Sequence, residues 1–182
     1  MAGLFSLIHR KFLQKVGDTM IFYDFEVFAY DWLVVLIDLN AKQETVIIND
    51  PDKLKGFYES HKETIWAGYN SRHYDQFILK GILCGFNPKK VNDWIILDDK
   101  PGYRFSSLFR NFPLINYDVM PNPPISLKAL EAFMGHSIKE TTVPFDIDRP
   151  LTEAELAETV KYCRHDVEET VDVWVRNIAE FN

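Results

Sequence analysis

Three segments near the start of the chain consist mainly of apolar and aromatic residues. They lie at 20–28, 32–39 and 45–48, are rich in Val, Ile, Phe and Tyr, and are joined by short polar connections. This pattern predicts three strands arranged as an antiparallel meander. Two further strands are expected at 65–69 and 114–119.

Helical periodicity and capping residues mark the segments between and after these strands. Asp50 and Pro51 match the preferred N-cap and first residue of a helix. Ser126 begins another helix, and the capping box Thr152–Glu155 begins a long final one. The four expected helices cover about 51–60, 72–84, 126–134 and 152 to near the C-terminus.

Proline residues are concentrated between positions 88 and 124, which hold six of the nine in the chain. We therefore expect little regular structure there apart from the strand at 114–119. The resulting element order is βββ-α-β-α-β-α-α. Three antiparallel strands followed by alternating helices and strands imply an α/β fold with a mixed five-stranded sheet and helices on both faces.

The length of 182 residues suits a single domain, which we assign to residues 20–182. Residues 1–19 are expected to form a helical extension, because apolar residues recur there at helical spacing with basic residues between them. This segment lacks the residue order of a secretory signal peptide. No apolar run reaches the ~20 residues of a membrane span, and two cysteines, Cys84 and Cys163, fit a reducing cytoplasm.

The charge balance limits how this chain can hold nucleic acid. It carries 20 basic and 27 acidic residues, a formal charge of -7 and a pI near 5.2. Such a balance argues against a broad basic face that binds duplex tightly. A site whose acidic side chains hold divalent cations would still be locally positive to a phosphate.

Two carboxylates share one face of the first expected strand. Asp24 and Glu26 are two residues apart, and side chains alternate between the faces of a strand. Side by side on a central strand they would repel each other and be costly to desolvate. A divalent cation such as Mg²⁺ or Mn²⁺ between them would remove both penalties. The alternative is an edge strand with two solvated acids.

Two further motifs lie where they can converge on this pair. Asn70 and Asp75 lie at the junction after the strand at 65–69, although Asn can simply cap a helix and Asp can be a first-turn acid. Tyr162 and Asp166 are four residues apart and share a face of the last helix. A surface acid beside an amphipathic tyrosine is the alternative there.

In this order, the motifs D-x-E, N-x₃-Y-D and Y-x₃-D resemble those of the DEDD superfamily of 3′–5′ exonucleases, over about residues 20–176. The resemblance implies an RNase H-like (DnaQ-like) fold. It also implies a centre that binds two divalent cations, Mg²⁺ or Mn²⁺, through four acids: Asp24, Glu26, Asp75 and Asp166.

The last motif resembles the tyrosine-type branch of this superfamily. Tyr162 lies four residues before the final aspartate, whereas the position used by the histidine-type branch is Lys161. His165 has a different offset, and we expect it to be a bystander. The resemblance implies that Tyr162 orients the attacking water, since a phenol with a pKa near 10 is a poor base at neutral pH.

Within that branch the chain is most similar to proofreading domains of family B DNA polymerases, especially those of protein-primed phage enzymes. Ser126 and Leu127 match their (S/T)-L-x-x-h motif. We hypothesise that a single-stranded 3′ end lies over a largely aromatic path that tolerates any base. The residues expected on this path are Phe28, Asn70, Tyr74, Ser126 and Leu127.

The chain departs from that subgroup at three positions. Val27 stands where those domains usually have Thr, and the spacing from Asn70 to Asp75 is one residue longer. Lys139 matches their K-x-x-h motif only loosely. Lys128 and Lys139 are candidates for phosphate contacts, and solvated surface positions are the alternative for each.

The resemblance implies a two-metal exonuclease that releases nucleoside 5′-monophosphates from single-stranded DNA 3′ ends, with RNA not excluded. Such a domain would act alone, with a polymerase, or as part of a larger phage replication protein. Two rivals remain open: a catalytically degenerate domain that binds nucleic acid or a partner, and a metal phosphohydrolase acting on mononucleotides.

Overall fold

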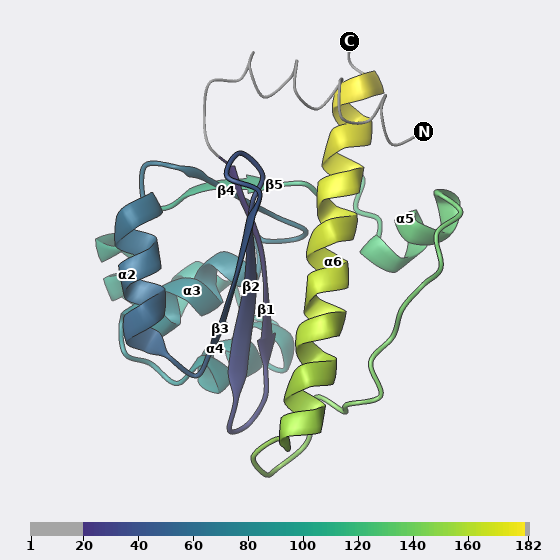
Figure 1. The fold of residues 1–182 in the computed structure, drawn as a ribbon. Helices are drawn as coiled ribbons and strands as arrows, with labels where there is room; N and C mark the ends of the chain where they lie inside the picture. Colours follow the sequence, from purple (N-terminus) through teal and green to yellow (C-terminus); the bar gives the residue numbers. More distant parts are fainter. Residues whose placement is uncertain (1–19, 181–182) are drawn as a thin grey trace.

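The computed structural model describes residues 20–180, which form a single sheet with helices packed on both of its faces (Figure 1). The strand order is β3-β2-β1-β4-β5. β1 pairs with β2, and β2 with β3, in antiparallel fashion, whereas β1–β4 and β4–β5 are parallel. The strands are β1 (Met20–Val27), β2 (Trp32–Asp38), β3 (Gln43–Ile48), β4 (Ile65–Gly68) and β5 (Ile115–Asp118). This is an RNase H-like topology, and it confirms the predicted fold class.

The helices divide between the two faces of the sheet. In Figure 1, α2, α3 and α4 lie on one side of the strands, and α5 and α6 lie on the other. The α-helices are α2 (Pro51–His61), α3 (Asp75–Leu83), α4 (Pro88–Ile96), α5 (Leu127–Phe133) and α6 (Glu153–Glu180), with two short 3₁₀ helices, η1 (Gly102–Arg104) and η2 (Ser107–Asn111).

Side-chain alternation along β1 creates two separate cores. Odd-numbered residues such as Phe25 pack with α2, α3 and α4, whereas Phe22 belongs to the core beneath α6. The rings of Phe22 and Trp174 meet edge to face at 5.4 Å, which anchors α6 across β1. Asp24 and Glu26 share the parity of Phe22 and therefore lie on the α6 side of the sheet.

The proline-rich region contains more regular structure than the sequence analysis predicts. Nine residues from Pro88 to Ile96 form α4, and the Asn87 side chain accepts a hydrogen bond from the Lys89 amide at 2.9 Å. Asn87 and Pro88 thus repeat the N-cap and first-residue arrangement of Asp50 and Pro51. Pro88 begins a helix here because its missing N–H would have no partner in a first turn.

The helix expected at 72–84 begins three residues later than predicted. The Asp118 carboxylate accepts hydrogen bonds from the amides of Asn70 and Arg72 at 2.9 and 3.0 Å. Asn70 has a positive φ of 58°, so the chain turns there instead of entering the helix directly. The result places Asp75 at the first residue of α3.

The structure bears on two other expectations from the sequence and leaves a third untested. No helix within residues 20–180 is long and apolar enough to cross a membrane. Cys84 and Cys163 are both free thiols, the first half-buried and the second buried. The predicted helical extension at 1–19 lies outside the described residues.

We expect Gly102→Ala to destabilise the fold by about 1–3 kcal/mol, because overpacking forces side chains to shift. A Cβ at Gly102 would lie 2.2 Å from Cδ2 of Phe77, a core residue of α3. Gly56→Ala is the matched control: it lies within α2 with no atom within 4 Å of the added methyl, and it should stabilise by about 0.5–1 kcal/mol. Urea unfolding measures both, and equal stability of the two variants would contradict this packing.

Candidate metal centre

Asp24 and Glu26 lie on β1, which is the middle strand of the sheet. Glu26 is 7 % exposed, and Asp24 is only partly accessible. The alternative of an edge strand with two solvated acids is therefore wrong. Both carboxylates are costly to ionise because they are at least partly removed from water. Their ligand oxygens and the Cys163 sulfur all lie within 4.8 Å of one another.

Asp75, the first residue of α3, comes close to this pair where β1 extends beyond the end of β4. β4 pairs with β1 only as far as Phe22 and ends at Gly68. The Phe25 amide therefore donates to the Asp75 carboxylate, with an N to Oδ1 distance of 2.9 Å. Asp75 is 2 % exposed, so this hydrogen bond fixes a buried carboxylate next to β1.

Helix α6 brings Tyr162 and Asp166 to the same end of β1. Between them, Cys163 packs directly on the strand and its thiol donates to the Asp24 backbone oxygen at 3.3 Å and to Asp24 Oδ2 at 3.4 Å. Burial raises the pKa of Cys163 well above its usual value, so the sulfur stays protonated and acts as a donor. The Cys163 contact therefore fixes the distance between α6 and β1 at Asp24.

The pKa values of all four acids are raised above their usual range. Burial is the largest cause for each, and it raises the pKa of Asp75 to about 7. The pKa of Asp24 is raised well above its usual range by burial and then by the charges of Asp75, Glu26 and Asp166. Glu26 is raised by burial and by Asp166 and Asp75. The structure thus brings together all four acids predicted from three separate motifs.

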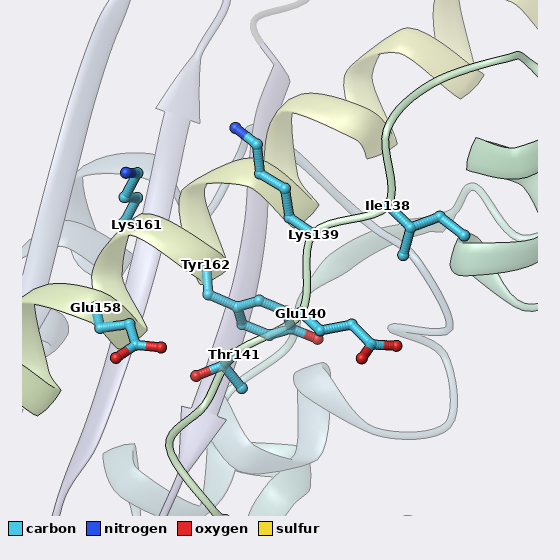
Figure 2. Close-up of a pocket in the computed structure, with 7 residues that line it drawn as sticks. All are labelled: Ile138, Lys139, Glu140, Thr141, Glu158, Lys161 and Tyr162. Atoms are coloured by element: carbon cyan, nitrogen blue, oxygen red, sulfur yellow. The ribbon is translucent and has the colours of Figure 1, made fainter.

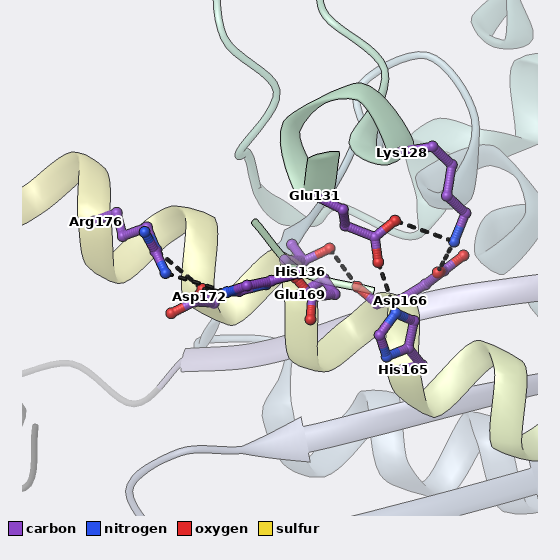
Figure 3. A network of polar contacts seen from close by, with 9 residues as sticks. Lys128, Glu131, His136, His165, Asp166, Glu169, Asp172 and Arg176 are labelled. Atoms are coloured by element: carbon purple, nitrogen blue, oxygen red, sulfur yellow. Dashed lines mark hydrogen bonds and ion pairs between the residues drawn. The ribbon is translucent and has the colours of Figure 1, made fainter. Parts of the chain in front are cut away.

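One ammonium group enters this cluster. Lys128, on α5, places its Nζ 2.7 Å from Asp166 Oδ1 and 3.4 Å from Glu131 Oε2 (Figure 3). The same nitrogen lies 4.9 Å from the centre of the Tyr162 ring. Its charge offsets part of the effect of burial on the pKa of Asp166. Within residues 20–180, no basic side chain forms an ion pair with Asp24 or Glu26.

The donor set fits divalent cations. Asp24, Glu26 and Asp75 are acidic, buried at least in part and without a cationic partner among the described residues, and hard carboxylate oxygens are the ligands that Mg²⁺ and Mn²⁺ prefer. Asp166 differs, because its carboxylate belongs to a second group of closely spaced ligand atoms with Glu131 and His165. The fourth acid is therefore held towards α5 by Lys128.

A pocket of about 430 Å³ lies beside Tyr162 (Figure 2). Tyr162 and Lys161 project from α6 on one side, and the loop that carries Lys139 and Thr141 forms the other. Burial raises the pKa of the Tyr162 phenol above its usual value of 10, with the Asp166 charge as the second cause. The hydroxyl beside this pocket is therefore protonated at neutral pH.

The predicted substrate path is only partly accessible. Phe28 is 1 % exposed and stacks on Phe145 with ring centroids 5.3 Å apart, so Phe145 presents the outer aromatic face. The Tyr74 hydroxyl donates to Asn92 Oδ1 at 2.6 Å, and this side chain is half-buried. Asn70 is half-buried as well.

The remaining two residues of that path begin α5. Ser126 is exposed, and its Oγ caps the helix by accepting from the Ala129 amide at 3.2 Å. Leu127 is half-buried against the core beneath α6. Only Ser126 of the five predicted contact residues is therefore fully on the surface.

Three side chains near the centre were missed or given another role by the sequence analysis. Glu131 is fully buried, and its Oε1 lies 2.6 Å from His165 Nε2, so His165, expected to be a bystander in the chemistry, has a structural partner. Lys128 pairs with acids instead of lying in solvent. The spacing of Lys128 and Glu131, three residues apart on one helix, is the signal that could have revealed the pair.

We expect the metal-free protein to lose stability as the pH rises from about 4 to 7. An unfolded Asp ionises near pH 4, whereas Asp75 in the fold keeps its proton up to about pH 7. The folded state therefore binds more protons in this window, and each extra proton lowers stability by about 1 kcal/mol per pH unit. Urea unfolding in a chelator should show this slope, and Asp75→Asn should make it shallower; an equal slope in the variant would contradict the assignment.

Comparisons with known proteins add no family to this description. No protein-family model, curated protein or solved structure matches the chain. The fold class rests on the strand order and pairing, and the chemistry of the centre rests on the side chains that the fold brings together.

Proposed function

We propose that this chain is a metal-dependent 3′–5′ exonuclease that hydrolyses phosphodiester bonds at the 3′ end of single-stranded DNA. One observation carries the proposal: carboxylates from three separate segments lie near one end of the central strand, where burial raises all of their pKa values and neighbouring acids raise those of Asp24 and Glu26 further. Such a cluster is stabilised by divalent cations, and its order along the chain is that of the tyrosine-type DEDD exonucleases.

Asp24 would be shared by two cations, with Glu26 and Asp166 completing one site and Asp75 contributing to the other. When bound, a pair of cations supplies charge stabilisation for both the attacking and the leaving oxygen. The protein itself holds these acids by defined contacts. The Phe25 amide orients Asp75, and the Cys163 thiol orients Asp24.

Tyr162 is suited to position a water molecule instead of deprotonating it. Its raised pKa keeps the phenol protonated at neutral pH, so the oxygen can both donate and accept a hydrogen bond. The pocket beside it is lined by Lys139 and Lys161, whose charge suits a phosphate, together with Glu140 and Glu158. A terminal nucleotide entering here would reach the acids of β1 past the Tyr162 ring.

The formal charge of -7 favours an enzyme that holds a few nucleotides weakly. We propose that a polymerase, or the rest of a larger phage replication protein, keeps such a domain on its substrate. RNA ends remain a second substrate class to be compared directly with DNA.

Asp24→Asn should lower the degradation of a 3′-labelled oligonucleotide by at least about 100-fold, because losing a shared ligand removes several kcal/mol of charge stabilisation. The assay uses single-stranded DNA and RNA in parallel, with Mg²⁺ or Mn²⁺ and with a chelator. Asp98→Asn is the matched control, since Asp98 is exposed and is not among the charges that act on the four acids. It should retain wild-type activity.

The outcomes separate the proposal from its rivals. Cleavage that survives Asp24→Asn or the chelator would contradict a metal-dependent mechanism at this centre. An inactive wild-type protein that still binds single strands would instead indicate a degenerate binding domain. Preference for mononucleotides over 3′ ends would indicate a phosphohydrolase.

Tyr162→Phe removes only the hydroxyl and should lower kcat by about tenfold or more, within the range of a positioned catalytic group. KM should change little, because the ring that faces the pocket remains. Steady-state degradation of the same oligonucleotide over a range of concentrations measures both values. An unchanged kcat would rule out a role for this hydroxyl in the reaction.

A further inference from the structure

Lys128 lies between two carboxylates that differ in their surroundings. Asp166 is partly accessible at the metal centre, whereas Glu131 is fully buried one turn along α5 from the lysine. The Nζ is 2.7 Å from Asp166 Oδ1, which is the distance of a charge-assisted hydrogen bond. It is 3.4 Å from Glu131 Oε2, which is close enough for an ion pair but longer than such a hydrogen bond. Figure 3 shows the ammonium flanked by both groups.

Glu131 has one satisfied oxygen and one open one. Its Oε1 lies 2.6 Å from His165 Nε2, which fixes the orientation of the carboxylate. Its Oε2 is buried and has no hydrogen-bond partner among the described residues. A buried carboxylate oxygen left in this state is unusual, because buried polar atoms are almost always hydrogen-bonded. The open oxygen faces Lys128.

We propose that Lys128 is a positioning residue with two partners: it holds Asp166 when no divalent cation is bound and moves to Glu131 Oε2 when Asp166 becomes a ligand. This inference rests on the proposed metal centre. A shift of about 0.5 Å would bring Nζ to the usual charge-assisted distance from Oε2. Glu131 then accepts the ammonium, and Asp166 Oδ1 is free to bind the cation.

The exchange accounts for three features of the site together. It explains why Asp166 is grouped with Glu131 and His165 instead of with Asp24 and Glu26. It explains why Glu131 is fully buried although its Oε2 has no hydrogen-bond partner among the described residues. It also keeps the ammonium beside the Tyr162 ring in both states, because both acceptors already lie within 3.4 Å of the same nitrogen.

Affinity for Mn²⁺, measured by isothermal titration calorimetry without nucleic acid, tests the exchange. Lys128→Met removes the competitor for Asp166 and should tighten binding by about tenfold, the scale of one charge-assisted hydrogen bond. Glu131→Gln weakens the alternative acceptor and should loosen binding several-fold. In the double variant the effect of Glu131→Gln should disappear, because it acts through Lys128.

Two matched variants separate this effect from a general change in charge. Lys89→Met removes an equal charge from a lysine paired with Asp93 at 2.9 Å on α4, and it should bind Mn²⁺ like the wild type. Lys128→Arg keeps the charge and should stay within about threefold of the wild type. Circular dichroism confirms that each variant folds; should Glu131→Gln not fold, Lys128→Met alone decides the question.

The result distinguishes failure of the inference from failure of the proposed function. A wild-type protein that binds no Mn²⁺, or binds it equally after Asp24→Asn, overturns the metal centre itself. A wild-type protein that binds Mn²⁺ through Asp24 while Lys128→Met leaves affinity unchanged or weaker overturns the exchange alone.

Discussion

The burial of several carboxylates close together is the constraint on which the rest of this structure depends. Asp24 and Glu26 lie on the central strand, and Asp75 is 2 % exposed. Bulk water therefore cannot fully solvate their ionised carboxylates. The fold responds in two ways. The pKa values of the acids are raised. In addition, the Phe25 amide donates a hydrogen bond to Asp75, and the Cys163 thiol donates one to Asp24.

Each of those contacts follows from the topology. β4 ends early, which leaves the Phe25 amide without a strand partner and open to Asp75. The alternation of β1 sends its even-numbered acids towards α6, where the small Cys163 allows the helix to approach the strand closely. A larger side chain at that position would move Tyr162 and Asp166 away from the acids, so the centre depends on packing as much as on charge.

Local patterns in the sequence were sufficient for the strands and the sheet type, whereas the set of four acids came from the resemblance of three motifs taken together. They failed at α4, because Pro88 was read as a breaker although Asn87 before it makes it a helix start. They also failed for Phe28, whose burial beneath Phe145 depends on a contact across more than a hundred residues. Periodicity reports local geometry, and only tertiary packing decides which aromatic ring of such a pair is outermost.

The α5 helix shows the same limit for polar residues. Spacing alone makes Lys128 and Glu131 an ordinary helical ion pair, of the kind that contributes little on a surface. Packing against α6 buries Glu131 completely and turns Lys128 towards Asp166, so the pair lies inside the electrostatics of the candidate centre. Ser126, the exposed cap of the same helix, is three residues ahead of Ala129 and adjacent to this network. A nucleic-acid strand bound at Ser126 would therefore contact the same helix that carries Lys128. In the proposed exchange, this short helix links substrate contact to metal binding.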